Sequence, residues 1–421
     1  MEYAHASERS WLSEGNTLRR HRCFTTGIPV LNTGLDRLLK NTTYLGFLQK
    51  QRVGFLGHAA SVTASYVHAI DALTAVGVRP VRLFGPEHGL RGEAQMMVAV
   101  ADAVDPLSGI PIQSLYGDDE ASLAPRREAV ADLDVILIDV QDVGSRYYTY
   151  AATALKLATL ATELGVNVIV LDRPNPLGRL REGAGIEPGF HSFVGELAVP
   201  NRHGLTIAEL FNWALQQGTK LYYEVISMEG WDNSKLLSED AFAWAMPSPN
   251  MPTMNTALVY PGGCLLEATN VSEGRGTTRP FELFGAPWVD AKALLDRLNE
   301  ADLPGVLWRM ASFMPTFDKF QGEVCQGLQL HVYDKSAFRP LRSYASVLLA
   351  LKQLHPEHFG WRPGAYEFVE DIPAIDLLAG SPALRGLIES ESDFEQIAQW
   401  SLCPEELDAS CRRAEHYDDT H

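Results

Sequence analysis

The feature that most constrains the fold is a regular alternation, from about residue 50, between short apolar runs and longer segments of helical pattern. The runs are rich in β-branched residues and read, in order, RVGFL, VRPVRLF, IPIQSLY, DVILIDV and VNVIVLD. Such alternation is typical of βα units that build a parallel sheet with helices on both faces. Helices are predicted over residues 65–76 and 150–164, the second ending at Gly165. The sequence therefore predicts an α/β fold with a doubly wound parallel sheet.

The length of the chain predicts a second domain, because 421 residues are too many for one ordinary hydrophobic core. The texture changes after about residue 230, where a Pro-rich crossing, MPSPNMP, precedes a Gly-rich loop and mixed segments. We predict an N-terminal extension over residues 1–24 and a catalytic sheet domain over residues 25–230. A smaller α/β (α+β) domain over residues 231–421 is expected to complete a cleft.

Charge and composition exclude several classes of function. The 53 acidic and 35 basic residues give a formal net charge of −18, which disfavours binding to nucleic acid or to anionic lipid. The five cysteines lack CxxC spacing, so neither a disulfide framework nor a zinc ribbon is indicated, and no cofactor is expected. No run approaches the roughly 18–20 apolar residues of a membrane span, and no signal peptide is evident. We expect a cytoplasmic protein, unless a different start codon adds a signal for export to the periplasm.

The segment after the second run concentrates chemically active side chains. In open parallel sheets, ligands bind beyond the carboxyl ends of the strands. FGPEHGLRGE places Glu87, His88 and Arg91 at such an end, with Glu93 close behind. Its glycines permit tight turns, so a purely structural loop is the alternative. Glu87 is the leading catalytic candidate.

The segment after the fourth run, QDVGSRYYTY, suits a sugar ligand. Aromatic rings pack on the apolar faces of sugars, while carboxylates and amides bind their hydroxyl groups. The candidates are Asp139, Gln141, Asp142, Arg146 and Tyr148. Core packing is an equally good interpretation of the tyrosines, and Asp142 could be only a helix N-terminal acid.

Two further segments supply candidates whose structural interpretation is equally strong. LDRPNPLGR contains Asp172, Arg173 and Asn175, where an Asp–Arg pair could simply hold the rigid Pro-Asn-Pro turn. NRHGLTIAEL places His203 before a helix that Thr206 and its third neighbour, a glutamate, would begin as a capping box.

The Gly-rich loop ATNVSEGRGTTRPFE is a candidate anion site. It contains Asn270, Glu273, Arg275 and Arg279, and its glycines would let the backbone approach a ligand closely. Two arginines in an acidic protein suggest a clamp for a negatively charged group. The loop matches neither GxGxxG nor GxxxxGK[ST], so nucleotide binding gains no support.

Together, FGPEHG, DVQDVGSRYYTY, LDRPNPLG, SFVGE, RHGLTIAEL, MPSPNMPT and TNVSEGRGTTRPFE resemble the NamZ-type exo-β-N-acetylmuramidase family, formerly a domain of unknown function. The resemblance runs from about Val30 to beyond Glu323. It implies a Rossmann-like amino-terminal domain, a smaller carboxyl-terminal domain, and a site in the cleft between them. It also implies an enzyme that removes terminal N-acetylmuramic acid from peptidoglycan fragments during cell-wall turnover or recycling. The family's proposed catalytic glutamate falls on Glu87, and His88 matches as well.

A glycosidase needs an acid for the leaving oxygen, and a carboxylate or the sugar's 2-acetamido group to assist at the anomeric carbon. We assign the acid role to Glu87, with Asp142 and Glu273 as candidate partners. Arg275 or Arg279 could bind the lactyl carboxylate of muramic acid. The competing arginines are Arg91, Arg146, Arg173 and Arg202.

Two rival functions stay open. The first is a metal-dependent hydrolase that would use His88, Asp139, Asp142 and His203, although no HExxH or paired-His spacing is present. The second is an amino-sugar-binding protein without catalytic activity.

Overall fold

The computed structural model describes residues 31–92, 102–117, 120–238, 241–242, 244–390 and 392–417. The predicted N-terminal extension, residues 1–24, and the candidate Glu93 lie outside the described residues.

A seven-stranded sheet and the helices packed on it form the first part of the molecule. The strands lie in the spatial order β3-β4-β2-β1-β5-β6-β7. Its strands are β1 (Val53–Gly57), β2 (Arg82–Gly85), β3 (Ala103–Val104), β4 (Pro111–Ser114), β5 (Val135–Asp139), β6 (Asn167–Leu171) and β7 (Glu224–Ile226). Neighbouring strands pair in parallel, except that β3 runs antiparallel to β4 at one edge. Each of the five predicted runs supplies a strand, and the predicted fold class is confirmed.

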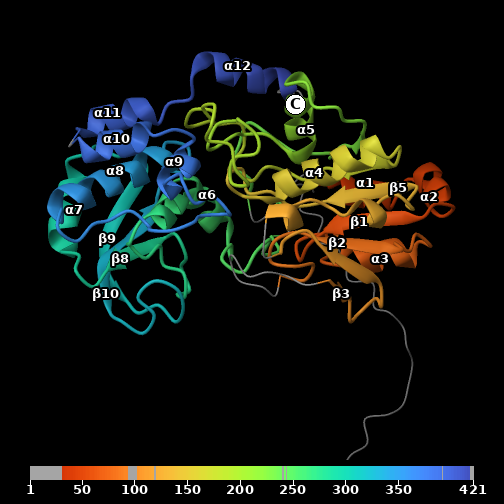
Figure 1. Cartoon of the computed structure of the whole chain (residues 1–421), viewed down its shortest axis with the longest axis horizontal. Helices are drawn as coiled ribbons and strands as arrows, with labels where there is room; N and C mark the ends of the chain where they lie inside the picture. Colours follow the sequence, from red (N-terminus) through yellow and green to blue (C-terminus); the bar gives the residue numbers. More distant parts are fainter. Residues whose placement is uncertain are drawn as a thin grey trace, which may run out of the picture.

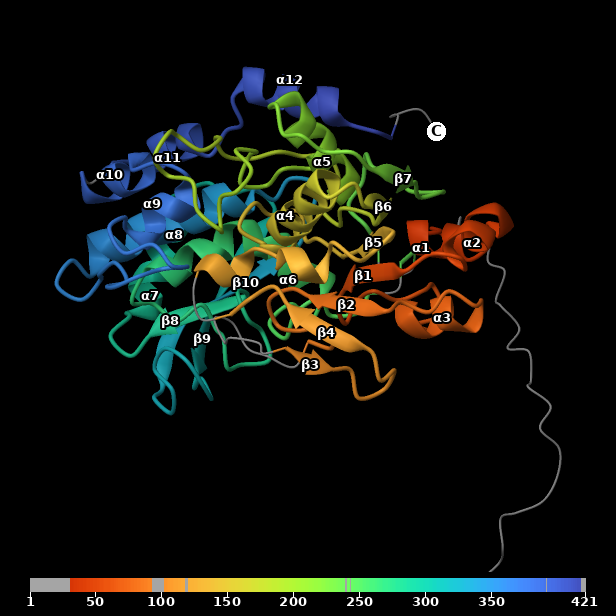
Figure 2. The ribbon, with the colours of Figure 1, turned by 45° about the vertical axis from the view of Figure 1, so that its right-hand side comes forward.

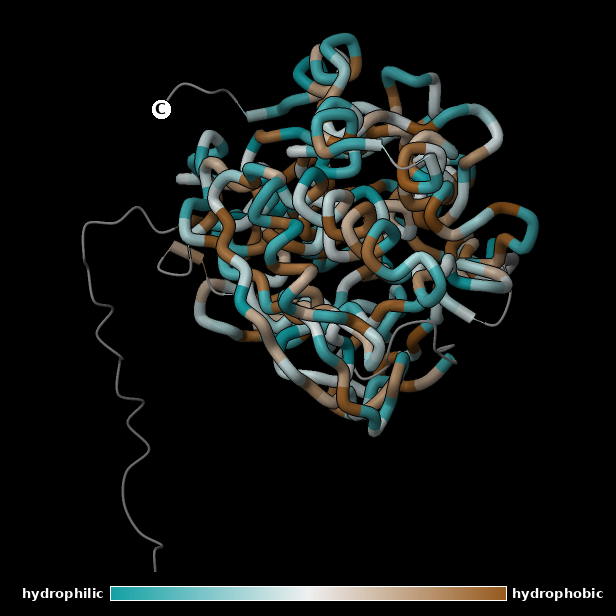
Figure 3. Tube along the Cα trace, turned by 90° about the vertical axis from the view of Figure 1, so that its left-hand side faces the viewer, coloured by the Kyte–Doolittle hydropathy of each residue, from teal (hydrophilic) through white to brown (hydrophobic). Residues whose placement is uncertain are grey.

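Helices cover both faces of this sheet (Figure 2). The helices of this part are α1 (Gly34–Leu38), α2 (Thr42–Leu48), α3 (Ala69–Ala75), α4 (Tyr150–Glu163) and α5 (Ile207–Gln216), with short 3-10 turns η1 (Glu120–Leu123) and η2 (Arg127–Ala129). Because side chains alternate along a strand, Phe55 of β1 enters the core under α1, α2 and α3, while Leu56 enters the core under α4 and α5. Two buried faces explain why the strands read as continuous apolar runs. Figure 3 shows hydrophobic stretches running through the middle of the trace.

The direction of strand addition reverses between β1 and β5. From β1 the chain moves outward through β2 to β4, and from β5 it moves outward on the other side through β6 to β7. Such a switch point is where open α/β sheets bind ligands, beyond the carboxyl ends of the strands. The segments that follow β1, β2 and β5 are therefore placed to form a site.

A three-stranded antiparallel sheet, in the order β8-β10-β9, and several helices form the second part. The elements are α6 (Met254–Gly263), η3 (Cys264–Ala268), β8 (Leu283–Ala286), α7 (Ala291–Asn299), β9 (Val306–Phe313), β10 (Cys325–Val332), α8 (Pro340–Leu354), α9 (Ala374–Ala379), α10 (Ala383–Glu389) and α11 (Phe394–Trp400). Helix α8 lies within the core, where Tyr344 and Leu348 are fully buried. Within the described residues, no helix is long and apolar enough to cross a membrane.

The last helix, α12 (Glu405–Ala414), returns to the first part and lies beside α5 (Figure 1). Its Cys411 and Ala414 join the core under α4 and α5. Just beyond it, the Tyr417 hydroxyl donates to Asp172 Oδ2 at 2.8 Å. The predicted domain over residues 231–421 thus ends in a segment that packs on the seven-stranded sheet part.

Candidate active site

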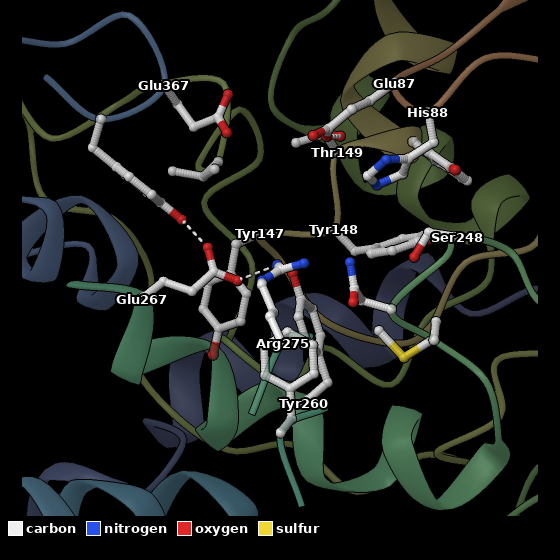
Figure 4. A pocket seen from close by; sticks show the side chains of 16 residues that line it. Glu87, His88, Tyr147, Tyr148, Thr149, Ser248, Tyr260, Glu267, Arg275 and Glu367 are labelled. Atoms are coloured by element: carbon white, nitrogen blue, oxygen red, sulfur yellow. Dashed lines mark hydrogen bonds and ion pairs between the residues drawn. The ribbon is translucent and has the colours of Figure 1, made fainter. Parts of the chain in front are cut away.

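A cavity lies between the two parts of the molecule, at the carboxyl end of the seven-stranded sheet (Figure 4). It encloses about 470 Å³ of empty space when its open mouth is counted, of which only about 40 Å³ is open to the centre of a water-sized sphere, so the cavity is narrow. The lining residues are Glu87, His88, Tyr147, Tyr148, Thr149, Tyr150, Val194, Ser248, Asn250, Met251, Tyr260, Glu267, Arg275, Phe281, Tyr366 and Glu367. The loops after β2 and β5 supply one wall, and the second part of the chain supplies most of the other.

Glu87 and His88 enter the cavity from the turn that follows β2. His88 has φ +70°, and Gly89 has φ +80°, so the turn uses the left-handed region at two successive residues. This region is costly for a residue with a side chain, and such conformations cluster at functional sites. Glu87 is buried, and its Oε2 accepts a hydrogen bond from Thr149 Oγ1 at 3.0 Å. The leading catalytic candidate therefore lies in the cavity.

The tyrosines of the loop after β5 line the cavity, whereas Asp142 of the same loop stabilises the loop's own conformation. Asp142 Oδ2 accepts from the backbone N–H of Gly144 at 2.6 Å, and His203 Nε2 lies 3.2 Å from the same oxygen. His203 Nδ1 accepts from the Leu205 N–H, so its Nε2 is the donor to Asp142. Both residues are buried outside the cavity lining. Tyr148 lines the cavity as predicted.

A second buried cluster lies beneath that loop, at the switch point itself. Asp139 Oδ1 accepts from Arg173 Nε at 2.5 Å, and Asp139 Oδ2 accepts from Arg173 Nη2 at 3.0 Å. The two side chains form a fully buried, bidentate ion pair. His58, directly after β1, accepts the Gln141 N–H at Nε2 over 2.8 Å, and its ring packs 4.7 Å from that of Tyr150. Burial holds the pKa of His58 well below its usual value, so the ring is neutral. The cluster positions the loop, and Asp139, Gln141 and Arg173 lie outside the lining.

The loop after β6, which holds the candidates Asp172 and Asn175, makes contacts outside the cavity. Asp172 Oδ2 accepts from Thr206 Oγ1 at 2.8 Å at the start of α5, where the predicted capping box is present. Burial, followed by the charge of Glu209, raises the pKa of Asp172 to about 7. Asn175 donates to the Leu205 carbonyl. Neither Asp172 nor Asn175 lines the cavity.

The competing arginines are already engaged away from the cavity. Arg91 forms a bidentate pair with Asp105, at 3.1 and 2.9 Å. Arg146 donates to the carbonyls of Ala184, Val199 and Leu378, and Arg202 lies 3.4 Å from Glu182. These contacts assign Arg91, Arg146 and Arg202 to holding the fold rather than to binding a ligand in this cavity.

Of the four candidates in the Gly-rich loop, Arg275 alone lines the cavity. Its Nη2 donates to Glu267 Oε1 at 2.6 Å, and its Nε lies 3.2 Å from Glu273 Oε1. Glu273 also binds Lys319 Nζ at 2.9 Å, and these cations lower its pKa against the opposing effect of burial. Glu273 is thus an ionised partner of two cations behind the lining.

The other two candidates of this loop point elsewhere. Arg279 is half-exposed, lies 3.5 Å from Glu282, and lines a different pocket. Asn270 donates to the His358 carbonyl and accepts from the Gly360 N–H, so it ties the loop to a neighbouring segment.

Sequence reasoning missed two acids of the cavity, Glu267 and Glu367. Glu267 comes from η3, and its Oε2 accepts from the Tyr366 hydroxyl at 2.9 Å. Glu367 lies between α8 and α9, and its Oε2 accepts from the Tyr116 hydroxyl at 3.2 Å. Neither follows a parallel strand, so the strand-end rule does not find them. It would have found His58, which comes directly after the first apolar run.

The residues that a metal-dependent hydrolase would use are not gathered in one place. Asp139 is paired with Arg173, and Asp142 with His203, while His88 lies in the cavity. In the described part of the chain, no group of three or more His, Cys, Asp or Glu side chains is arranged to hold a metal ion.

Comparison with known proteins identifies the family. The model of the exo-β-N-acetylmuramidase NamZ N-terminal domain matches residues 53–255, and that of the NamZ C-terminal domain matches residues 258–409. The chain is 40% identical over 374 residues to the peptidoglycan β-N-acetylmuramidase NamZ of Bacillus subtilis, covering 88% of this chain and 87% of that protein.

Two crystal structures of DUF1343 family proteins from Bacteroides fragilis share the architecture. One is 29% identical with a TM-score of 0.80, covering 92% of this chain and 99% of that one. The other is 24% identical with a TM-score of 0.71, covering 93% and 99%, and supports the fold alone. With both halves matched in order and a relative at 40% identity, this chain belongs to the NamZ family of exo-β-N-acetylmuramidases, which are glycosidases.

Proposed function

We propose that this protein releases terminal N-acetylmuramic acid from peptidoglycan fragments as an exo-acting β-N-acetylmuramidase. The observation that carries the proposal is Glu87 in a chain of the NamZ family. This buried carboxyl group lies in the cavity at the carboxyl end of the seven-stranded sheet.

The chemistry of the lining supports this substrate class. Glycoside hydrolysis needs one group that protonates the leaving oxygen and a second that assists at the anomeric carbon. Glu87 is one such carboxyl group, while Asp142 and Glu273, the partners expected from sequence, lie behind the lining. The rings of Tyr148 and Tyr260 offer apolar faces on which a sugar can pack.

Arg275 is the proposed contact for the lactyl carboxylate that distinguishes muramic acid from N-acetylglucosamine. It is the arginine of the Gly-rich loop that reaches the cavity, whereas Arg279 does not. Its charge is shared with Glu267 and Glu273, so a substrate carboxylate would compete with two internal partners. We therefore expect a modest contribution to affinity rather than a dedicated clamp.

The test of the proposed function compares 4-nitrophenyl glycosides of β-N-acetylmuramic acid and of β-N-acetylglucosamine. We expect nitrophenol release from the first and little from the second. Binding of the muraminide without release on prolonged incubation would instead support the amino-sugar-binding protein. Activity on neither sugar would contradict the proposal.

The Glu87→Gln variant tests the site, because the amide preserves shape and removes the titratable group. We expect kcat/KM on a muramic-acid disaccharide to fall by about 10²–10⁴-fold, the usual contribution of acid–base catalysis. A folded variant that cleaves at the parent rate would make Glu87 structural.

We also propose a cytoplasmic location, with recycled wall fragments as substrate. Fractionation of the native cells, with an antibody to detect the protein, tests this location.

A further inference from the structure

The cavity contains a carboxyl group that faces Glu87 from the other part of the molecule. Figure 4 shows the side chains of Glu367 and Glu87 entering from opposite sides, with Glu267 and Arg275 along another wall. Their exposed fractions are 5% for Glu367 and 6% for Glu87. A glycosidase needs two groups that flank the bond to be cleaved, and these two belong to segments on either side of the interface.

The backbone at Glu367 is held in an unfavourable conformation. Glu367 has φ +46° and Phe368 has φ +69°, two successive residues with side chains in the left-handed region. This region is unfavourable for a residue with a side chain, so the surrounding structure must impose it. Reciprocal backbone hydrogen bonds between Tyr366 and Val369, at 2.9 and 3.0 Å, close the turn. The surrounding structure thus stabilises an unfavourable turn that carries Glu367 into the cavity.

A third strand end of the large sheet supports Glu367. Tyr116 follows β4 and donates its hydroxyl to Glu367 Oε2 at 3.2 Å. Its ring lies 6.0 Å from that of Phe368 and 5.9 Å from that of Phe193. These aromatic groups fix the carboxyl group and reduce its contact with water. Glu87, by comparison, accepts a hydrogen bond from Thr149.

The charges around Glu367 favour its neutral form at pH 7. Burial, and next the charge of Glu87, raise the pKa of Glu367 to about 8. The charge of Glu267 acts in the same direction, while the Tyr116 hydroxyl and the charge of Arg362 oppose it. Two like charges in one low-dielectric site cannot both form cheaply, so the pair retains a proton.

We propose that Glu367 is the proton donor for the leaving oxygen and that Glu87 is the second carboxyl group of the same catalytic pair. The inference rests on the proposed function and changes the role assigned to Glu87 from sequence. The glycosidic C–O bond breaks, and the leaving oxygen takes the proton of Glu367. Water supplies hydroxyl to the anomeric carbon, and its remaining proton returns to the carboxyl pair, which restores the starting state.

The first test is a leaving-group comparison between Glu367→Gln and Glu87→Gln. A nitrophenolate leaves with little protonation, whereas a sugar alcohol needs it. Glu367→Gln should therefore lose about 10²–10⁴-fold in kcat/KM on the disaccharide, and much less on the nitrophenyl muraminide. Glu87→Gln should lose activity on both substrates. The reverse pattern would make Glu87 the donor and overturn the proposal, while a parent protein inactive on both would refute the proposed function instead.

The second test is the dependence of kcat/KM on pH for the disaccharide. The parent should lose activity as pH rises through about 8, because Glu367 gives up its proton there. Glu87→Gln removes a negative charge and should move this basic limb of its residual activity to lower pH. Tyr116→Phe removes a hydrogen bond to the ionised form and should move the limb to higher pH.

The matched control is Glu370→Gln, the same chemical change three residues along the same loop at an exposed position. It should leave both kcat/KM and the pH profile unchanged. If Glu367→Gln does not fold, the profiles of Glu87→Gln and Tyr116→Phe still decide. A basic limb that neither variant moves would overturn the assignment of the proton to Glu367.

Discussion

Replacement of Arg275 by Ala tests whether the fold depends on the buried ion cluster at the cavity wall. Arg275 bridges Glu267 and Glu273, and all three side chains are buried. After the change, Glu273 keeps Lys319 at 2.9 Å, whereas Glu267 keeps neutral neighbours, among them the Tyr366 hydroxyl at 2.9 Å. One carboxylate is then left buried without a cation.

Removing one partner of a buried ion pair costs about 3–5 kcal/mol. Loss of the contact between the Arg275 guanidinium and the Phe281 ring, 5.0 Å apart, adds to this cost. We therefore expect the Arg275→Ala variant to lose about 3–5 kcal/mol in its free energy of unfolding. Michaelis constants for a muraminide would then be interpreted only at temperatures where the variant is folded.

Arg279→Ala is the internal control, because it makes the same change four residues away in the same loop. The Arg279 side chain is 49% exposed, against 7% for Arg275, and its pair with Glu282 is 3.5 Å long. Exposed pairs of this kind contribute about 0–1 kcal/mol. Urea unfolding of both variants measures the contrast. If their free energies of unfolding agree within about 1 kcal/mol, the cluster does not stabilise the fold as argued.

Two further predictions concern pH and metals. Burial raises the pKa of Asp172 to about 7 from 3.8, so between these values the unfolded carboxyl is ionised while the folded one holds a proton, and stability falls as pH rises. The difference between these two pKa values corresponds to roughly 4 kcal/mol in the free energy of unfolding. In urea unfolding at pH 4.5 and 7, the free energy of unfolding should fall less for Asp172→Asn than for the parent. Equal falls would contradict the assignment. Because Asp139 is paired with Arg173 and Asp142 with His203, we expect muraminidase activity to be unchanged in excess chelator, whereas loss on chelation and recovery with added metal would favour the metal-dependent rival.

Local patterns in the sequence were sufficient for the elements of the large sheet. The apolar runs predict β1, β2, β4, β5 and β6, most clearly for the central strands β1 and β5, which are buried at every position and so need apolar residues on both faces. The capping box at Thr206 and the end of α4 near Gly165 depend on neighbours within a few residues, so they too could be read directly. The turn that carries Glu87 follows from the strand-end rule and from the family's motif.

Tertiary structure alone decided which polar groups reach the cavity. Asp142, Asp172 and Glu273 have the same local signature as Glu87, a carboxyl group in a glycine-rich or proline-rich loop. Each is buried against a partner distant in sequence: His203, Tyr417 and Lys319 respectively. Glu367 does not directly follow a strand, and it lines the same cavity as Glu87 only because the two parts of the chain pack together. A local pattern records which face of an element is buried, whereas the pairing of charges depends on contacts between distant segments, which only the packed fold creates.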